Sequence, residues 1–495
     1  MTIDKAENPP PLLGRIVAAM AIFIVITFSV RLWAAWKNYH QIDPTAGVWT
    51  AAALDARQGM LYRPIVSDIG YGGSRYAPLH VVLQAGLMRI GLGPVASGYL
   101  LDAGGVVLVI AGLYALMRQL EVPAARAGAM ACFVLAAYCY CTTAGGLKGD
   151  LLPAGLNLAG LSAVVRATRR PKVRLGRLML LAAAICFVLA TATKITSVFG
   201  IASAGLWLAF RGRWRAALFL GAIWVIGIGV AAWATQRASD GRALEIFRLC
   251  AAGGGGMGQL LLGPRRMFQE SIHSDRIFVL FWLIALGLVV IGRAWTSLPV
   301  ILFIITSMGT VLIFGSPGTN ANHLVDLDAA AVLVIATQLK ASKAGILGAL
   351  AVSLIVGFAG VNHLVRTAKI VHEARHGQML AALAQTHGSP VAGPLLSENP
   401  ILPILEGERP YMLDSFMFRT IRMRQAQIAE RFWTELSERH FRAVILNSPP
   451  SEKSYETNAG DFGPGFIKRL EQSYTLSGIH GDYYVYLPKS PKSSK

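Results

Sequence analysis

The sequence is poor in charged residues and in cysteine. Only 15% of its 495 residues are charged, and five are cysteine. Four of the cysteines fall in apolar segments and only Cys250 falls in a loop, so their spacing offers no disulfide framework and no zinc site. The first apolar run, 16–36, is long enough to span a membrane and lacks a clear cleavage site for a signal peptidase. We therefore expect this run to remain as an anchor.

Apolar residues, in contrast, are abundant. They make up 54% of the chain, and runs of about 20 of them recur, each long enough to cross roughly 30 Å of hydrocarbon. This pattern predicts a polytopic α-helical membrane protein in contact with membrane lipids. The net charge of +19 would suit a nucleic-acid partner, but the lysines and arginines cluster at span ends, where the positive-inside bias places them. We therefore predict no nucleic-acid partner.

The basic residues also set the direction of the spans. Segment 166–177 carries six positive charges and no acid, which predicts a cytoplasmic location. Counting in both directions from it gives about eleven spans in an inner (plasma) membrane, with the N-terminus in the cytoplasm and the C-terminus outside. Segment 76–92 is short for a span and contains Arg89, so we interpret it as re-entrant or interfacial. If it crosses instead, it adds a twelfth span.

The composition changes to that of a soluble domain near residue 365. We divide the chain into a membrane domain, 1–365, whose first outer loop is 37–95, and an extracytoplasmic domain, 366–495. Short strands are predicted at 391–397, 410–413, 443–447 and 483–487. Residues 416–439 are predicted to form an amphipathic helix with four apolar residues near one face: Phe418, Ile421, Ile428 and Phe432. This small α/β domain is expected to cover an active site, to recognise an acceptor, or to serve as a structural cap.

Under this topology, aspartates gather at or near the outer face: Asp43, Asp55, Asp68, Asp102, Asp150, Asp326 and Asp328. Ionisable groups at membrane depth are costly, so such a rim suggests a reaction site or an ion path. Asp326 and Asp328 point about 200° apart on a helix, whereas His323 and Asp326 lie on one face. That pair is expected to contact an acceptor, or else to be a polar helix start facing other helices. One histidine with one carboxylate is a weak ligand set, so no metal is predicted.

The stretch 39–79 crowds acids, arginines, tyrosines and glycines directly after the first span. Within it, Asp43 precedes Pro44, and residues 45–58 are predicted to form a short helix that Gly59 terminates. This arrangement allows two interpretations of Asp43. It is the N-cap of the helix, or it is a carboxylate at the membrane surface that acts as a general base on a hydroxyl or an amine.

Several motifs accompany this acid. A short helix follows it, then the turn Gly59–Tyr62 and the tetrapeptide Tyr76–Leu79. Later motifs are Leu147–Pro153, which contains Asp150, and Thr193–Thr196, which contains Lys194. Together they resemble C-type (GT-C) glycosyltransferases, a class that includes the protein O-mannosyltransferases and the bacterial aminoarabinose transferase of lipid A. The resemblance covers most of residues 10–365.

The resemblance implies a GT-C-like fold and transfer of a hexose or pentose from a polyprenyl phosphate on the outer face, with inversion and without a cofactor. The acceptor would be an envelope glycan, lipid or protein. The catalytic acid of the family falls on Asp43. The chain departs from the family at Pro44, where many members have a second acid, and at Tyr76-Ala77, where many have His-Pro. The first departure leaves one carboxylate as base, and the second predicts altered acceptor contacts.

Fixed cations near the donor phosphate would stabilise the charge of the leaving group. Four candidates are predicted at outer positions: Arg75, Lys194, Arg265 and Arg266. Each is alternatively an ordinary headgroup contact or a snorkelling side chain. The candidates for contacts to the acceptor or the sugar are Tyr62, Asp68, Tyr76, Asp150, His323 and Asp326. Two other classes of function stay open, a transporter with an outward-facing acidic site and a noncatalytic membrane scaffold.

Overall fold

The computed structural model describes residues 11–169, 173–251, 257–274, 276–316, 318–339, 343–451, 453, 455 and 461–490. Residues 170–172 of the basic segment that sets the predicted topology lie outside this set. The chain groups into two compact units. The helical unit comprises Met1–Ala34, Leu100–Ala231 and Gly255–Lys369, and the α/β unit comprises Ala35–Tyr99, Ala232–Gly254 and Ile370–Lys495. The first outer loop therefore groups with the C-terminal region.

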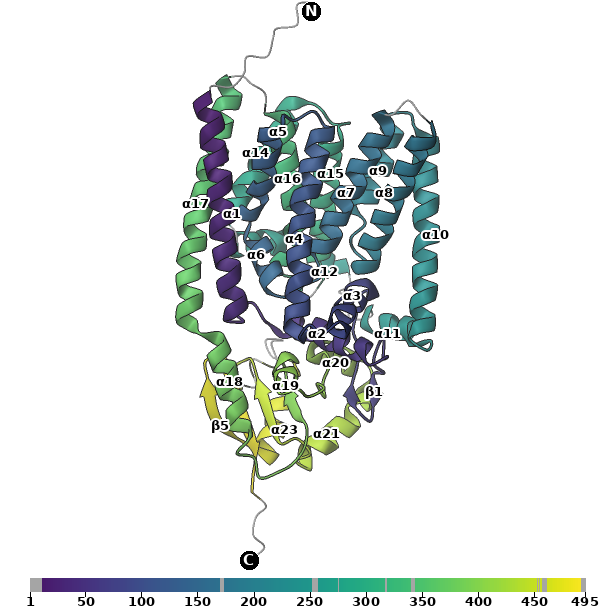
Figure 1. Ribbon diagram of the computed structural model, residues 1–495. Coiled ribbons are helices and arrows are strands. Elements are labelled where there is room, and N and C mark those ends of the chain that lie inside the picture. Colours follow the sequence, from purple (N-terminus) through teal and green to yellow (C-terminus); the bar gives the residue numbers. More distant parts are fainter. Residues whose placement is uncertain are drawn as a thin grey trace, which may run out of the picture. The chain divides into compact units, whose positions relative to one another are not determined.

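Among the described residues, six helices are long and apolar enough to span a membrane (Figure 1): α1 (Pro11–Lys37), α4 (Pro94–Gln119), α7 (Leu151–Arg169), α8 (Val173–Thr193), α10 (Trp214–Ala238) and α17 (Lys343–Glu373). A pair bent by 70° would make a seventh span: α5 (Ala124–Phe133), continued by η1 (Val134–Ala136), and α6 (Tyr138–Gly145). Shorter apolar helices are α9 (Phe199–Phe210), α14 (Arg276–Gly292) and α15 (Leu298–Phe314). The prediction of a polytopic helical membrane protein is confirmed.

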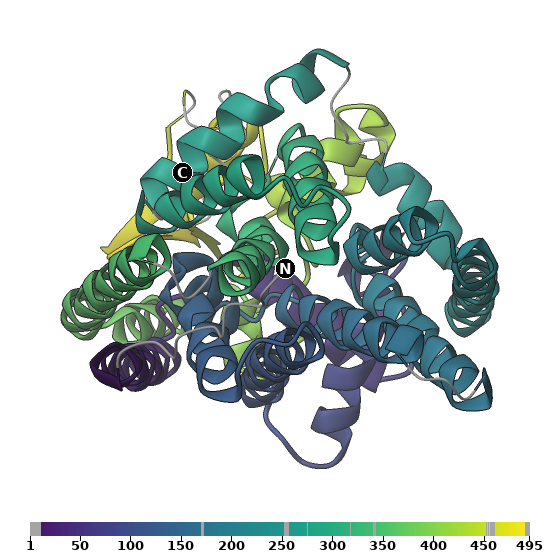
Figure 2. The same cartoon turned by 90° about the horizontal axis from the view of Figure 1, so that it is seen from above.

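Figure 2 shows the helices of this unit end-on. Small residues let some of these helices approach one another closely. A Cβ atom on Gly160 of α7 would lie 2.9 Å from the Phe187 Cδ1 atom of α8, so only glycine fits there. The short helix η2 (Ala321–Leu324) leads into α16 (Val325–Gln338), in which 11 of 14 residues are buried. A charged side chain at the start of α16 therefore faces protein and not lipid. The unit also contains α12 (Met257–Leu261) and α13 (Gly263–Ser274).

The first outer loop of the α/β unit begins with the predicted short helix. This helix, α2 (Pro44–Arg57), starts with proline in its first turn, and Gly59 follows its end with a φ of 87°, a conformation that glycine adopts without strain. A two-stranded hairpin comes next, formed by β1 (Val66–Ser67) and β2 (Gly70–Tyr71). Segment 76–92 contains α3 (Pro78–Arg89), whose 12 residues extend about 18 Å. This helix also carries Arg89 in its last turn, which favours a re-entrant or interfacial position.

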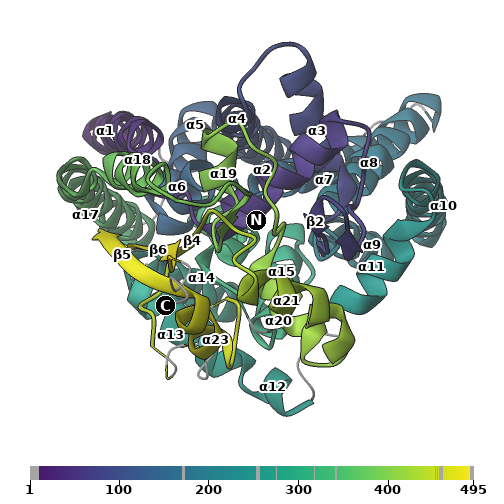
Figure 3. The ribbon, with the colours of Figure 1, turned by 90° about the horizontal axis from the view of Figure 1, so that it is seen from below.

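The C-terminal region contains a four-stranded sheet in the order β3-β4-β6-β5. Three strands match predicted ones, namely β3 (Leu395–Ser397), β4 (Ala443–Leu446) and β6 (Tyr483–Pro488). The fourth, β5 (Tyr474–His480), is an edge strand that sequence reasoning missed (Figure 3). Strands β3 and β4 are parallel, and the other two pairs are antiparallel. The remaining helices of the α/β unit are α11 (Arg242–Ala251), α18 (Arg375–Thr386), α19 (Ile401–Leu405), α20 (Ser415–Arg422), η3 (Ala426–Ala429), α21 (Glu430–Ser437) and α23 (Phe466–Ser473).

Two further predictions for this region were wrong in detail. Residues 410–413 do not join the sheet, because their backbone pairs with the outer loop: Tyr71 N–H donates to Tyr411 O at 2.8 Å, and Leu413 N–H donates to Tyr71 O at 2.9 Å. The single helix predicted at 416–439 is divided into α20, η3 and α21. The division places Phe432 in the main aromatic core and Ile421 in a second cluster with α11.

Candidate functional site

Asp43 caps the first helix of the outer loop. Its Oδ1 atom accepts a hydrogen bond from the Ala46 backbone N–H at 2.9 Å, and Pro44 opens the helix. The partial positive charge of the helix N-terminus stabilises the ionised carboxylate. The prediction that Asp43 is the N-cap of this helix is therefore confirmed. A cap occupies one lone pair of one carboxylate oxygen, so the cap and the general base are compatible roles for the same residue.

Tyr62 and Tyr76 contact each other in the same loop. The Tyr62 hydroxyl donates to the Tyr76 carbonyl oxygen at 2.8 Å, and burial raises the pKa of Tyr62. The Tyr76 ring stacks on Trp49 with centroids 4.0 Å apart. Both tyrosines line a small hollow together with Arg63 and Val81. The two candidate acceptor contacts thus line the same hollow in the loop. The Tyr62 hydroxyl already donates its hydrogen bond to the backbone of Tyr76.

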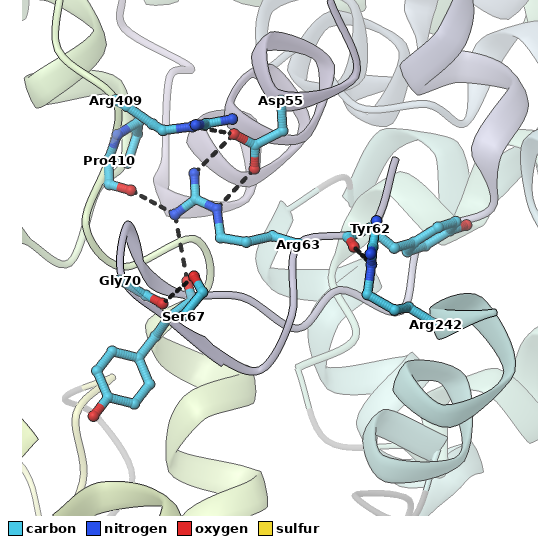
Figure 4. Close-up of polar contacts among 9 residues, drawn as sticks. Asp55, Tyr62, Arg63, Ser67, Gly70, Arg242, Arg409 and Pro410 are labelled. Atoms are coloured by element: carbon cyan, nitrogen blue, oxygen red, sulfur yellow. Dashed lines mark hydrogen bonds and ion pairs between the residues drawn. The ribbon is translucent and has the colours of Figure 1, made fainter. Parts of the chain in front are cut away.

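A buried ion triad fixes the end of α2, as Figure 4 shows. The turn at Gly59 reverses the chain, so that Arg63 Nε lies 2.8 Å from Asp55 Oδ2 and Arg63 Nη2 lies 2.9 Å from Asp55 Oδ1. Arg409 Nε adds a third contact, to Asp55 Oδ1 at 2.7 Å. Asp55 and Arg63 are each only 1% exposed. Burying the charges of Asp55 and Arg63 without partners would cost several kcal/mol of stability, roughly, and these contacts offset that cost.

Sequence reasoning missed most of this triad. It placed Asp55 only in the acidic rim and assigned nothing to Arg63 or Arg409. Gly59, which lies between Asp55 and Arg63, was the one sequence feature that indicated a chain reversal able to bring the two side chains together. Arg409 lies 354 positions from Asp55, and a pairing over that distance leaves no pattern in a single sequence.

The loop candidates Arg75 and Asp68 lie in different surroundings. The Arg75 guanidinium lies over the Phe416 ring, 5.6 Å from its centroid, and it contributes to the electrostatic environment of Asp414. Burial raises the pKa of Asp414 to about 6, and its bond to the Met417 N–H and the charge of Arg75 oppose the shift. Asp68, in contrast, is fully exposed, 3.8 Å from Arg431. Arg75 therefore engages the C-terminal region, and Asp68 faces solvent.

Buried acids in the C-terminal region were also missed by sequence reasoning. Glu398 is 1% exposed and accepts three hydrogen bonds, from Asn447 N–H at 2.7 Å, Tyr455 Oη at 2.8 Å and Asp461 N–H at 2.9 Å. Burial nevertheless raises the pKa of Glu398. Burial and the charges of Glu398 and Asp414 raise the pKa of Asp461 well above its usual range. Glu398 thus connects β3 to three residues that follow β4 in the sequence, Asn447, Tyr455 and Asp461.

The raised pKa of Asp461 predicts a pH-dependent stability. Because the folded-state pKa lies above the ordinary value near 4, the contribution of this group is complete below about pH 4 and is lost as the pH rises through the folded-state value. We expect Asp461→Asn to flatten this decline when unfolding of the full-length protein is measured across pH. Asp482→Asn, at an exposed turn, is the matched control. Equal slopes for Asp461→Asn and wild type would contradict the prediction.

Three of the predicted site residues come together in the helical unit. Asp150 precedes α7, Lys194 follows α8, and His323 lies in η2. The Lys194 ammonium forms an ion pair with Asp150 Oδ1 and lies 2.9 Å from His323 Nδ1. Asp150 Oδ2 accepts a hydrogen bond from Asn322 Nδ2 at 2.8 Å. We call these four residues the Lys194 cluster.

In the Lys194 cluster, opposing effects act on the pKa of Asp150. Burial alone would raise the pKa of Asp150, but the charge of Lys194 and the bonds from Lys194 and Asn322 lower it on balance. An ammonium group only donates hydrogen bonds, so the His323 Nδ1 atom accepts from Lys194. The cluster thus presents a lysine whose charge a buried aspartate holds in place. A fixed cation of this kind suits an anionic ligand.

The predicted orientation of the two aspartates in α16 is confirmed. Asp326 lies within electrostatic range of Lys194 and Asp150, and therefore borders the Lys194 cluster. Asp328 faces elsewhere, where it accepts hydrogen bonds from Cys139 Sγ at 2.9 Å and Trp282 Nε1 at 2.7 Å. Asp326 is a candidate ligand contact, and Asp328 is part of the helix packing.

The other two candidate cations belong to α13. Arg265 is exposed, whereas the half-buried Arg266 donates to the Gly315 carbonyl oxygen at 3.4 Å and to Gln259 Oε1. Arg266 is thus engaged with the turn after α15. Within the part of the chain that the structure describes, no group of three His, Cys, Asp or Glu side chains is placed to hold a metal ion.

The fold described above is similar to that of solved membrane glycosyltransferases. ArnT from Cupriavidus metallidurans, in a structure bound to undecaprenyl phosphate, is similar with a TM-score of 0.57 and 15% identity over 94% of this chain and 97% of ArnT. The archaeal oligosaccharyltransferase AglB from Archaeoglobus fulgidus, in complex with an inhibitory peptide and a dolichol-phosphate, has a TM-score of 0.56 and 12% identity over 96% of this chain and 75% of AglB.

A second structure of the Archaeoglobus fulgidus oligosaccharyltransferase, with Zn and sulfate, has a TM-score of 0.54 and 13% identity over 91% of this chain and 71% of that one. No family model and no curated protein matches the sequence. At these identities the likeness establishes the fold. The predicted resemblance to the GT-C class is confirmed at that level.

Proposed function

We propose that this protein is an integral membrane glycosyltransferase that transfers a sugar from a polyprenyl phosphate to an envelope glycan, lipid or protein on the outer face of the membrane. The observation that carries the proposal is the fold likeness over 94% of the chain to ArnT bound to undecaprenyl phosphate. AglB in complex with a dolichol-phosphate supports the same class of donor. The Lys194 cluster adds a fixed cation suited to a lipid phosphate.

The proposed topology has about eleven spans, with the N-terminus in the cytoplasm and the C-terminal region outside a plasma membrane. The described helices that would supply the spans are α1, α4, the bent pair α5 and α6, α7, α8, α9, α10, α14, α15, α16 and α17. The short α3 would lie re-entrant or at the interface. Labelling of an engineered Met60→Cys from the cytoplasmic side alone would contradict this topology.

In the proposed reaction Asp43 acts as the general base. It takes the proton from the acceptor hydroxyl or amine as that atom attacks the anomeric carbon of the donor sugar from the face opposite the phosphate. The bond between the anomeric carbon and the phosphate oxygen breaks, and polyprenyl phosphate leaves with the electron pair. The configuration of the sugar is inverted. No proton has to reach the phosphate, which is a stable anion.

Cations near the phosphate would stabilise the charge that develops there. Lys194 is the best supported of the four candidates, because Asp150 and His323 hold its ammonium in a defined position. We propose that Asp150 and His323 position Lys194 and that Asp326 contributes a contact beside it. Arg75, Arg265 and Arg266 stay candidates for the same phosphate, and Tyr62, Asp68 and Tyr76 stay candidates for the acceptor.

The proposal is tested by incubating the purified protein with radiolabelled polyprenyl-phosphate sugars and envelope acceptors. Transfer from one donor supports it, and absence of transfer from every donor contradicts it. In the same assay, Lys194→Gln is expected to lower transfer at least about tenfold, because a charge-assisted contact to the phosphate is lost. Arg265→Gln, at an exposed arginine, is the comparison. An effect of Arg265→Gln as large as that of Lys194→Gln would contradict the preference for Lys194.

A further inference from the structure

Two arginines and a histidine meet inside the helical unit. Arg31 on α1 is 1% exposed, and its Nη1 atom lies 2.7 Å from the Nδ1 atom of His363 on α17. The guanidinium carbons of Arg31 and Arg366 lie 5.0 and 4.4 Å from the centroid of the Tyr138 ring. We call Arg31, Tyr138, His363 and Arg366 the cationic cluster.

The hydrogen bonds determine the charge of His363. A guanidinium group only donates, so the Nδ1 atom of His363 must accept from Arg31 and carries no proton. The proton is then on Nε2, which donates to the Leu135 carbonyl oxygen at 3.0 Å. That carbonyl lies at the 70° bend between α5 with η1 and α6, where the regular helical bonding is interrupted. His363 is therefore neutral, and it links Arg31 to the broken span.

Each of the two arginines carries a unit positive charge. Among the residues that the structure describes, neither guanidinium forms an ion pair with a carboxylate. The Nε atom of Arg31 is buried and has no hydrogen-bond partner in that part of the chain. Stacking on Tyr138 offsets only a part of this cost. Buried positive charge of this kind calls for a counter-anion.

The position of the cationic cluster along its helices indicates that the counter-anion is a lipid headgroup. Arg31 precedes the end of α1 at Lys37 by about 9 Å along the helix axis, and Arg366 precedes the end of α17 at Glu373 by about 10 Å. Both residues thus lie near the boundary between hydrocarbon and headgroups.

The two helices that carry the arginines lie side by side. A Cβ atom on Gly357 of α17 would lie 3.2 Å from the Sδ atom of Met20 of α1, and Figure 1 shows the two helices adjacent. Only 22% of the apolar window of α1 and 28% of that of α17 is buried inside the protein. Most of their surface is therefore open to lipid. Arg366 is half-buried, whereas Arg31 is buried.

We infer that the cationic cluster binds the phosphate group of a membrane lipid. A phosphate offers anionic oxygens that match the planar donor fork of a guanidinium. Arg366, the half-buried member of the cluster, would contact the phosphate, and the charge of the buried Arg31 would add to the attraction. The phosphate would belong to an anionic phospholipid or to a polyprenyl phosphate. The inference does not require the proposed transfer reaction, because it concerns binding alone.

The test is a lipid titration of the full-length protein in detergent, with bound lipid counted by native mass spectrometry. Phosphatidylglycerol, undecaprenyl phosphate and diacylglycerol are the probes. We expect saturable binding of a phosphate-bearing lipid and, in Arg366→Gln, a binding constant weaker by about tenfold. Phosphatidylglycerol and undecaprenyl phosphate distinguish the two lipid sources. Arg15→Gln, at an exposed arginine near the other end of α1, is expected to bind like wild type.

Three results would overturn the inference. One is an equal loss of binding in Arg366→Gln and Arg15→Gln. Another is a loss of diacylglycerol binding as large as that of the phosphate-bearing lipids, because apolar contacts would then explain retention. The third is binding of inorganic phosphate without retention of any lipid. Because Arg366 is half-buried, Arg366→Gln is expected to fold, and the unfolding temperature of each variant checks this.

Discussion

Asp43→Asn is expected to lower sugar transfer roughly 10²- to 10⁴-fold, the usual contribution of general base catalysis. Asparagine is as good an N-cap as aspartate, so the hydrogen bond to the Ala46 N–H is retained while the proton acceptor is lost. The substitution therefore separates the two interpretations of Asp43. The measurement is the initial rate of transfer from a radiolabelled polyprenyl-phosphate sugar.

Two control variants separate the loss of the carboxylate of Asp43 from the loss of its N-cap. Asp43→Ser keeps a capping side chain without a carboxylate and should be as inactive as Asp43→Asn. Asp482→Asn removes an exposed carboxylate from a turn of the same α/β unit and is expected to leave the rate close to wild type. Full activity of both Asp43→Asn and Asp43→Ser would show that Asp43 is a cap and nothing more. Another residue would then have to supply the base.

Asp55→Asn is expected to destabilise the protein by about 3–5 kcal/mol, the usual cost of breaking a buried ion pair by removing one partner. The substitution leaves the fully buried Arg63 without its carboxylate and removes the partner of Arg409 as well. Thermal unfolding of the purified protein measures the effect.

The comparison for Asp55→Asn is Asp68→Asn, whose carboxylate is exposed and whose unfolding transition should match wild type. Arg63→Gln should come close to Asp55→Asn, because Arg63 also donates to the Pro410 carbonyl oxygen at 2.6 Å. Arg409→Gln should cost less, since its side chain is 24% exposed. Unfolding of Asp55→Asn at the wild-type temperature would refute the role assigned to the triad.

Local patterns predicted the parts of the fold that local forces determine. The apolar runs gave the spans because a helix must satisfy its backbone within one segment of lipid. Asp43, Pro44 and Gly59 gave the bounds of α2, because a cap, a first-turn proline and a terminating glycine act within a few residues. The opposite orientation of Asp326 and Asp328 followed from helical geometry alone.

Parts that depend on distant partners were not predictable. Residues 410–413 were predicted as a strand of the sheet, yet they pair with Tyr71 of the outer loop. Strand β5 was missed because it is an exposed edge strand with few buried side chains. In the helical unit, Asp150, Lys194 and His323 were each predicted as site residues, but only the fold brings the ends of three helices together around them.

The pairing of the outer loop with residues 409–413 has a consequence for biosynthesis. Arg63 emerges from the ribosome 347 residues before its partner Pro410. At about 5–20 residues per second, the loop waits roughly 20–70 s for that partner, while most of the spans are still being inserted. During this interval the loop lacks Arg409 and the backbone partners of Tyr71. A nascent chain stopped before residue 409 would therefore expose the loop to proteases, and completion of the C-terminal region would close it.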